Sequence, residues 1–168
     1  METTKLKGNT VNLTGQQRNI GDAAPEVKVI KNDLSEKVIG GAKGVVQIIA
    51  FVPSLDTEVC ATETRKFNQK VADLGNIDFT IVSMDLPFAQ SRFCSTEGID
   101  KVDVTSDFRN KEASESYGML IADGPLAGLS ARAIFIIDKD GKIAYKEIVP
   151  EITEEPDYDK VLNFVKSM

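Results

Sequence analysis

The residues in this chain that are best suited to nucleophilic or redox chemistry are two cysteines, Cys60 and Cys94. No histidine accompanies them, so Ser-His-Asp and Cys-His catalysis are excluded. Zinc sites that need imidazole are excluded too, and two cysteines alone make a poor metal site. What remains is the chemistry of a thiolate nucleophile or of a redox pair.

Cys60 lies where the sequence predicts a strand, a loop and the start of a helix. The run GVVQIIAFV at 44–52 is apolar almost throughout, which indicates a strand buried on both faces. A helix is predicted from about 58 to 74, so Cys60 falls in its first turn, at the sheet edge where active groups of α/β proteins gather. Unpaired N–H groups and the helix dipole stabilise a thiolate there, and cysteine pKa values fall from about 8.5 to about 3.5–7.5 in such settings. Thr57 is the candidate N-cap, and we expect its hydroxyl to reach the first-turn amides or the sulfur.

The acidic residues around Cys60 oppose thiolate formation. Asp56 and Glu58 both lie close to it in sequence, so a positive group must outweigh them. Arginine suits this task better than lysine, because its planar fork can hold both the sulfur and a substrate oxygen. Arg132, at the start of a predicted strand, is the candidate, and Arg65 and Arg92 are its rivals.

A structural interpretation of both cysteines also stands. A cysteine on an apolar helical face is commonly a small buried hydrophobic residue, and Cys60 shares such a face with Thr64, Phe67, Val71 and Leu74. The charged residues of this helix are expected mostly elsewhere on it: Glu63, Arg65, Lys66 and Lys70. Cys94 belongs to no C-x-x-C motif, so it is a second buried thiol, half of a fixed disulfide, or a thiol that must approach Cys60.

The remaining elements follow from periodicity and turn residues. Strands are predicted at 3–7 and 10–13 around Gly8-Asn9, and at 27–30, 34–38, 77–84, 132–137 and 142–149. Helices are predicted from Pro87 to 92 or 94, at 111–117, and from Pro156 onward with Tyr158, Val161, Leu162 and Val165 inward. The order is a βαβ unit at 44–84, an irregular helical insert, then ββα. That is the order of an α/β, thioredoxin-like fold with an N-terminal β-hairpin extension, and we expect one domain over 1–168.

Composition narrows the partners. The formal net charge is −6 and the sequence pI is about 4.8, and an acidic surface repels phosphate backbones, so nucleic acid is not expected as a partner. The longest apolar run, 44–52, is too short to span a bilayer. The first residues, METTKLKGNTVNL, do not read as a secretory signal. We therefore expect a cytoplasmic protein without a membrane partner, in which a disulfide is transient.

Several segments resemble a known family. Pro53, Thr57 and Cys60 form the pattern P-x-x-x-T-x-x-C, which is the peroxiredoxin signature. The strings PSLDTEVC, TRKFN, MDLPFAQSRFC, FRN, IADGPLAGLSARA and EITEEPDYDK follow one another along the chain. In this order they are similar to the thiol peroxidase branch, the atypical two-cysteine peroxiredoxins, over essentially the whole chain.

The resemblance implies a role for each site residue. Cys60 corresponds to the peroxidatic cysteine and Cys94 to the resolving cysteine of the same subunit, so the two form an intramolecular disulfide. Thr57 and Arg132 correspond to the threonine and arginine that organise the peroxide site, and Pro53 shields it. Because Cys60 is expected inside a helix, its first turn and the Cys94 segment must unwind before the disulfide closes.

The resemblance also implies an activity and partners. Members of the family reduce hydrogen peroxide and organic hydroperoxides, are recycled by thioredoxin, are commonly homodimers, and need no metal or bound cofactor. Glu58 departs from the small residue or proline common in relatives, and this bears on the acidity of Cys60. Three other functions remain open: a redox sensor using the same disulfide, a disulfide reductase, and a domain with inert thiols.

Overall fold

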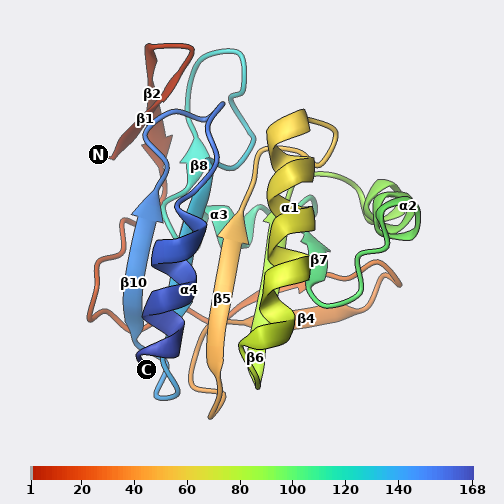
Figure 1. Cartoon of the computed structure of the whole chain (residues 1–168). Coiled ribbons are helices and arrows are strands. Elements are labelled where there is room, and N and C mark those ends of the chain that lie inside the picture. The colour runs from red at the N-terminus through yellow and green to blue at the C-terminus, as the bar shows by residue number, and fades with distance from the viewer. Residues whose placement is uncertain (1) are drawn as a thin grey trace.

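A mixed sheet of seven strands forms the centre of the computed structural model, which describes residues 2–168 (Figure 1). The strand order is β10 (Ile143–Ile148), β9 (Ala133–Ile137), β5 (Val46–Phe51), β6 (Ile77–Ser83), β7 (Asp103–Ser106), β3 (Val27–Ile30) and β4 (Glu36–Ile39). Strands β5, β6 and β7 are parallel, and the other pairs are antiparallel. A smaller sheet joins β1 (Thr3–Leu6), β2 (Asn9–Thr14) and β8 (Leu120–Ile121).

The helices are short and lie on both sides of the central sheet. They are α1 (Glu58–Lys70), continued by a 3₁₀ turn at Val71–Asp73, α2 (Pro87–Glu97), α3 (Glu112–Ser116) and α4 (Tyr158–Lys166). Figure 1 shows α1 and α4 in front of the sheet, α3 behind it, and α2 beside α1 at the edge. Within residues 2–168, no helix combines the length and apolar composition needed to cross a bilayer.

Strand β5 is buried on both faces, as its apolar run predicts. All six of its residues are buried. Because successive side chains of a strand point to opposite faces, Ile48 and Ala50 join the apolar cluster that contains Cys60, whereas Ile49 and Phe51 join the cluster on the other face. The predicted βαβ unit, with β5 and β6 parallel and α1 between them, is confirmed. Cys60, in the first turn of α1, is therefore part of the packed core on one face of β5.

The predicted boundaries are wrong at two turns. The first hairpin turns at Lys7 and Gly8 instead of Gly8 and Asn9, because both residues take positive φ, 50° and 84°, and Leu6 pairs with Asn9. Strand β4 begins two residues later than expected, because Leu34 lies in the left-handed region at φ 72° and still belongs to the turn. The short strands β7 and β8 were not predicted.

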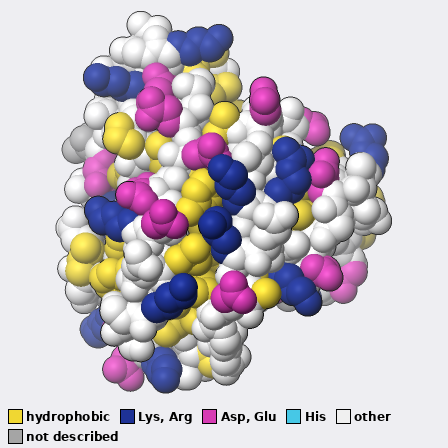
Figure 2. Space-filling model, in the orientation of Figure 1, with side chains coloured by type: hydrophobic (Ala, Val, Ile, Leu, Met, Phe, Trp, Pro, Cys, Tyr) yellow, Lys and Arg dark blue, Asp and Glu magenta, His cyan; other side chains and the backbone are white. Residues whose placement is uncertain are grey.

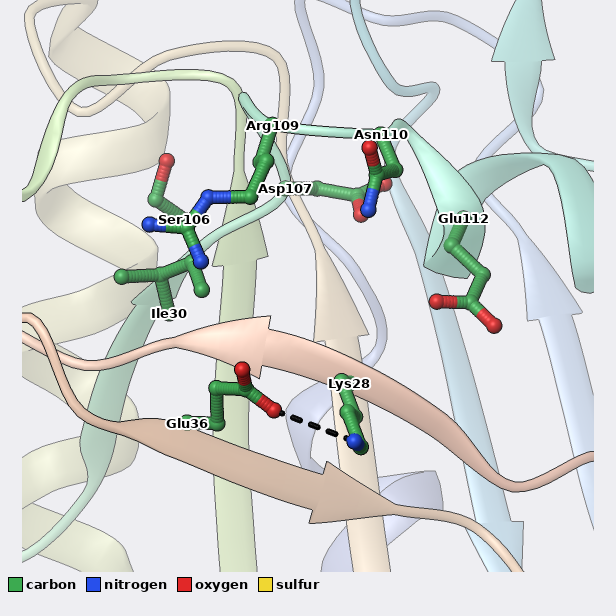
Figure 3. Close-up of a pocket in the computed structure, with 8 residues that line it drawn as sticks. All are labelled: Lys28, Ile30, Glu36, Ser106, Asp107, Arg109, Asn110 and Glu112. Atoms are coloured by element: carbon green, nitrogen blue, oxygen red, sulfur yellow. Dashed lines mark ion pairs between the residues drawn. The ribbon is translucent and has the colours of Figure 1, made fainter.

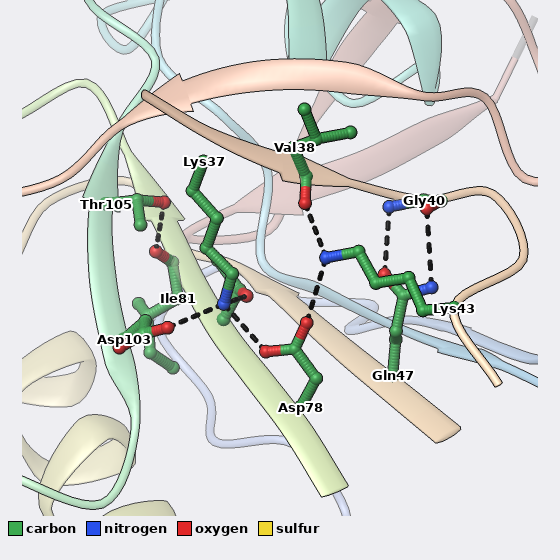
Figure 4. Close-up of polar contacts among 10 residues, drawn as sticks. Lys37, Val38, Gly40, Lys43, Gln47, Asp78, Ile81, Asp103 and Thr105 are labelled. Carbon is green, nitrogen blue, oxygen red and sulfur yellow. Dashed lines mark hydrogen bonds and ion pairs between the residues drawn. The ribbon is translucent and has the colours of Figure 1, made fainter. Parts of the chain in front are cut away.

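A cluster of charged side chains fastens β4 to β6 and β7 (Figure 4). The Lys37 ammonium lies 2.7 Å from Asp78, 2.6 Å from Asp103 and 2.8 Å from the hydroxyl of Thr80. Lys43 adds a contact of 3.0 Å to Asp78. Partial burial acts to raise the pKa of Asp78, but the two lysines outweigh it and hold this pKa below its ordinary value. The cluster therefore links the edge strand β4 to strands β6 and β7 through side-chain contacts.

Candidate active site

Cys60 occupies the first turn of α1 with its side chain fully buried and its thiol free. The first backbone bond of the helix runs from the Ala61 N–H to the Thr57 carbonyl at 3.0 Å. The amides of residues 58–60 thus precede the helical ladder, where unpaired N–H groups carry the positive end of the dipole. This is the position that the sequence predicts for Cys60.

Thr57 is the N-cap residue of α1, but its hydroxyl does not cap the helix. It donates instead to the Ser54 carbonyl at 2.8 Å. The expectation that this hydroxyl reaches the first-turn amides is therefore wrong in this structure. Because its proton is committed to Ser54, the oxygen of Thr57, which lines the hollow described below, is left as a hydrogen-bond acceptor.

The loop between β5 and α1 is held by an aspartate that the sequence did not single out. Asp85, which follows β6, accepts from the Ser54 hydroxyl and from the Leu55 N–H, each at 2.7 Å. It also accepts from the Ser83 hydroxyl at 2.7 Å. Parallel strands end at the same edge, so a carboxylate after β6 can fix the loop after β5. Asp85 thereby fixes the backbone that leads into Thr57 and Cys60.

Arg132 directly precedes β9, and its side chain is only 2% exposed. Its Nε donates to the Ile152 carbonyl at 2.9 Å and its Nη1 contacts a Glu63 oxygen at 2.7 Å. Burial acts to lower the pKa of Arg132, but Glu63 and then the Cys60 sulfur outweigh it and raise this pKa above its ordinary value. The structure therefore brings the guanidinium of Arg132 to the sulfur.

The two rival arginines lie elsewhere. Arg65 is partly exposed and pairs with Glu97 of α2 at 3.1 Å. Arg92 lies on the exposed side of α2. Of the three candidate arginines, Arg132 is the one that interacts with the Cys60 side chain.

Glu63 was expected on the solvent side of the helix, and this expectation is wrong. Its side chain is fully buried, because it lies three residues after Cys60 and so shares the inward face of α1. One carboxylate oxygen contacts Arg132, and the other has no hydrogen-bond partner among the described residues. Burial raises the pKa of Glu63 to about 7, although Arg132 opposes this shift. A carboxyl group that changes charge near neutral pH thus supports the arginine.

An apolar hollow of about 540 Å³ opens beside this site. Pro53, Thr57, Val59 and Arg132 are among its lining residues, and the part next to the buried Pro53 and Arg132 is called its inner end here. Its walls come from the first hairpin, the loop after β8 and the segment after β10: Leu6, Val11, Leu126, Leu129 and Ile152. Glu58 and Lys7 lie on the rim. The hollow can hold an apolar group far larger than a water molecule next to the Arg132 guanidinium.

Cys94 lies in the last turns of α2, half-buried and free. The Asn32 side-chain amide donates to its sulfur at 3.6 Å. Burial raises the pKa of Cys94, and the Asn32 contact opposes this shift. Although Cys60 and Cys94 belong to the same apolar cluster, the structure does not join their sulfurs. A bond between them therefore requires a change from this arrangement.

A second hollow is a weaker candidate. It is polar, has a volume of about 80 Å³, and lies between the β3–β4 hairpin and the segment from Ser106 to Glu112 (Figure 3). Lys28 and Glu36 on its wall pair at 3.3 Å and are both well exposed. Neither cysteine contributes to it. On the face shown in Figure 2, basic and acidic side chains are interspersed, so no single sign of charge marks a further site there.

Comparisons with known proteins agree on one group of relatives. A family model described as Redoxin matches residues 19–162. A thiol peroxidase of Aquifex aeolicus is 58% identical over 99% of this chain and 98% of its own length. One of Campylobacter jejuni is 55% identical over 96% and 91%, and one of Bacillus subtilis is 42% identical over 100% and 99%.

Solved structures agree with these matches. A peroxiredoxin-like protein of Aquifex aeolicus superposes with a TM-score of 0.97, at 57% identity over 99% of this chain and 97% of that one. A thiol peroxidase of Chromobacterium violaceum shares the fold, with a TM-score of 0.87 at 16% identity over 98% and 95% of the two chains. The fold is thus the expected thioredoxin-like α/β arrangement.

Proposed function

The chain belongs to the redoxin family and, within it, to the peroxiredoxin-type thiol peroxidases, and from this premise we propose that Cys60 is the group that reduces the hydroperoxide. One observation carries the proposal: a buried thiol at a helix N-terminus has a buried guanidinium, Arg132, acting on it. No histidine is present to act as a base. Backbone amides and Arg132 must therefore keep the sulfur anionic.

The reaction is a displacement on the O–O bond. The Cys60 thiolate attacks the terminal peroxide oxygen, so that an S–O bond forms and the O–O bond breaks. The leaving alkoxide, or hydroxide from hydrogen peroxide, takes up a proton equivalent to the one that the Cys60 thiol released on ionising, and departs as an alcohol or as water. Arg132 and the first-turn amides donate hydrogen bonds to the oxygens, on which negative charge grows as the bond breaks. Thr57 accepts from the peroxide O–H and so orients it. Cys60 is left as a sulfenic acid.

The apolar hollow favours organic hydroperoxides besides hydrogen peroxide. Its walls supply apolar contacts for an alkyl or aryl group, while Arg132 at its inner end receives the peroxide. Hydrogen peroxide needs only the inner end. Binding energy from the organic group can lower KM and help to position the O–O bond.

We propose Cys94 as the resolving thiol. Its thiolate attacks the Cys60 sulfenic sulfur, so that the S–S bond forms, the S–O bond breaks, and hydroxide leaves and is protonated to water. Since Cα atoms in a disulfide lie about 4.4–6.8 Å apart, the first turn of α1 and the end of α2 must both unwind. Thioredoxin then reduces the disulfide by thiol exchange and returns both thiols.

The proposed recycling reaction also indicates the compartment in which the protein acts. Recycling by thioredoxin requires a reducing compartment, so we propose that the protein acts in the cytoplasm.

We also propose a homodimer, supported by Leu86 and Phe88 at the start of α2, which are 52% and 70% exposed. Large exposed apolar side chains that lie together are commonly covered by a partner. Sedimentation of the wild type and of Phe88→Glu tests this, and a wild-type monomer at micromolar concentration would contradict it.

The decisive experiment follows peroxide consumption with thioredoxin, thioredoxin reductase and NADPH. We expect Cys60→Ser to be inactive, and Cys94→Ser to reduce one equivalent of peroxide and then stop. Turnover by Cys94→Ser at the wild-type rate would overturn the resolving role. If wild-type protein reacts with peroxide no faster than free cysteine does, the peroxidase function is overturned and the redox-sensor function is favoured.

A further inference from the structure

The contact between Asn32 and Cys94 joins two parts of the chain that are distant in sequence. Asn32 lies in the turn between β3 and β4, and its Nδ2 reaches the Cys94 sulfur on α2 at 3.6 Å, which is within hydrogen-bond range for sulfur. The hairpin that carries it extends toward the α2 side of the molecule in Figure 1. The two residues also line one hollow, together with Ile99 and Val102. The contact therefore forms only when α2 is folded and lies in this position.

The turn holds Asn32 firmly. The Lys31 N–H donates to the Ser35 carbonyl at 2.8 Å, and the Leu34 N–H donates to the Lys31 carbonyl at 2.9 Å. Asp33 accepts from the Ser35 N–H at 3.0 Å. The amide of Asn32 thus projects from a fixed platform, while the helix that it contacts is the one that must unwind.

Stability alone does not explain this amide. Its Oδ1 atom is buried and has no hydrogen-bond partner among residues 2–168. A buried acceptor without a partner is unfavourable for folding, and each such group in a native protein calls for a reason. The partner that the same side chain does have is the sulfur of the second redox residue.

We propose that Asn32 is a positioning residue for Cys94, which holds the reduced thiol in folded α2 and so favours the dithiol over the Cys60–Cys94 disulfide. This inference rests on the proposed resolving role of Cys94. The contact exists only while Cys94 remains on α2, and it is lost when the sulfur moves to Cys60. By linkage, a contact that is made in only one of the two states shifts the equilibrium toward that state.

Among the polar groups around the Cys94 sulfur, Asn32 is the one that makes a specific contact with it. The charged residues that line the hollow are Lys31 and Asp33 from the turn and Asp100 and Asp103 from the segment before and at β7, and α2 itself carries Arg92 and Glu97. Burial and the Asn32 contact are the two influences on the pKa of Cys94. The amide is neutral at every pH, so its contact strengthens when Cys94 ionises, because hydrogen bonds to charged atoms are stronger.

The test is the equilibrium of the full-length protein with glutathione. Glutathione disulfide oxidises the two thiols to the intramolecular disulfide and is reduced to two glutathione molecules, and the fraction oxidised is read by alkylation and mass spectrometry. For Asn32→Ala we expect the equilibrium constant for oxidation to rise about fivefold at pH 7, as for one lost hydrogen bond. That corresponds to a midpoint potential about 20 mV more negative, at about 30 mV per tenfold change. Asn32→Asp, which keeps the shape but cannot donate, should shift it in the same direction.

Lys31→Ala is the matched control, because Lys31 lines the same hollow without contacting the sulfur, and it should leave the equilibrium unchanged. A second readout needs no disulfide: in a Cys60→Ser background, Asn32→Ala should raise the pKa of Cys94, measured by alkylation rate against pH. Wild-type values for both Asn32 variants, or an equal shift in Lys31→Ala, would overturn the proposal. If oxidised wild type contains no Cys60–Cys94 disulfide, the resolving role itself fails, and the pKa readout still decides whether Asn32 acts on the sulfur.

Discussion

The carboxylate of Glu63 and the guanidinium of Arg132 form a buried ion pair at 2.7 Å, on the same helical face as Cys60 and one turn after it. The pair joins α1 to the start of β9, across 69 positions of sequence. The same guanidinium acts on Cys60. Glu63 thus holds in place the arginine that also interacts with the sulfur.

The first prediction concerns Glu63→Gln and the pH dependence of stability. The pKa of Glu63 is raised from 4.5 to about 7 in the folded protein, chiefly by burial. The stability contributed by its bound proton is therefore complete below pH 4.5 and is lost as the pH rises to about 7. Glutamine never ionises and loses no such stability. The free energy of unfolding of Glu63→Gln, measured relative to that of wild type, should therefore rise by about 1–3 kcal/mol between pH 4.5 and pH 7. Urea unfolding at several pH values measures it, and parallel curves for the two proteins would contradict it.

The second prediction concerns the geometry of the guanidinium. Arg132→Lys keeps the positive charge but loses the fork that contacts Ile152 and Glu63 together. The rate constant for oxidation of Cys60 by peroxide should fall about 10- to 100-fold. Rapid quenching with mass spectrometry of the sulfenic acid measures it. Arg65→Lys is the control and should keep the wild-type rate, and an unchanged rate in Arg132→Lys would remove that residue from the peroxide site.

Local sequence patterns predicted the frame of this site because its parts are local. The apolar run of β5 and the 3.6-residue period of α1 place Cys60 in the first helical turn without any distant contact. The resemblance to peroxiredoxins on PSLDTEVC supported the same fold. The α4 prediction is right for Val161, Leu162 and Val165, which are buried, while Tyr158 stays partly exposed and packs on Phe67.

Long-range partners escaped the same reasoning. A glutamate in a helix is usually predicted to be a surface residue, and the contact with Arg132, 69 positions later in the chain, makes burial of Glu63 tolerable. The fit of Asp85 to the loop after β5, and of Asn32 to Cys94, likewise depends on how separate elements meet. The short strands β7 and β8 were missed because four and two residues carry too little periodicity.

The third prediction concerns the charged cluster at the end of the sheet. Lys37→Met should lower the free energy of unfolding by about 2 kcal/mol at neutral pH, because Asp78 and Asp103 lose their shared partner. The folded pKa of Asp78 lies below its ordinary value, so the loss should be complete above about pH 4 and fade as the pH falls further. Lys28→Met is the control, because its exposed pair with Glu36 contributes little. Equal effects of the two variants in urea would contradict this assignment.

The fourth prediction concerns the size of the substrate. Leu126→Trp fills part of the apolar hollow and should raise KM for cumene hydroperoxide about tenfold. The rate with hydrogen peroxide should stay within about twofold of wild type, because that substrate needs only the inner end. Ala127→Trp is the control, since this exposed neighbour does not line the hollow. Loss of both activities in Leu126→Trp, with the fold intact by circular dichroism, would contradict a role in substrate size.

The last prediction concerns the movement that closes the disulfide. In the reduced protein the Arg65–Glu97 pair at 3.1 Å joins α1 to α2, and Asn68 of α1 accepts from the Lys101 N–H, in the segment after α2, at 2.7 Å. Oxidation should release the first turn of α1 and the end of α2, so their amides should exchange with deuterium at least about tenfold faster in the disulfide form. Strand β5 is the internal control and should exchange equally slowly in both forms. Equal protection of both helical segments in the two forms would mean that the disulfide closes without the unwinding proposed here.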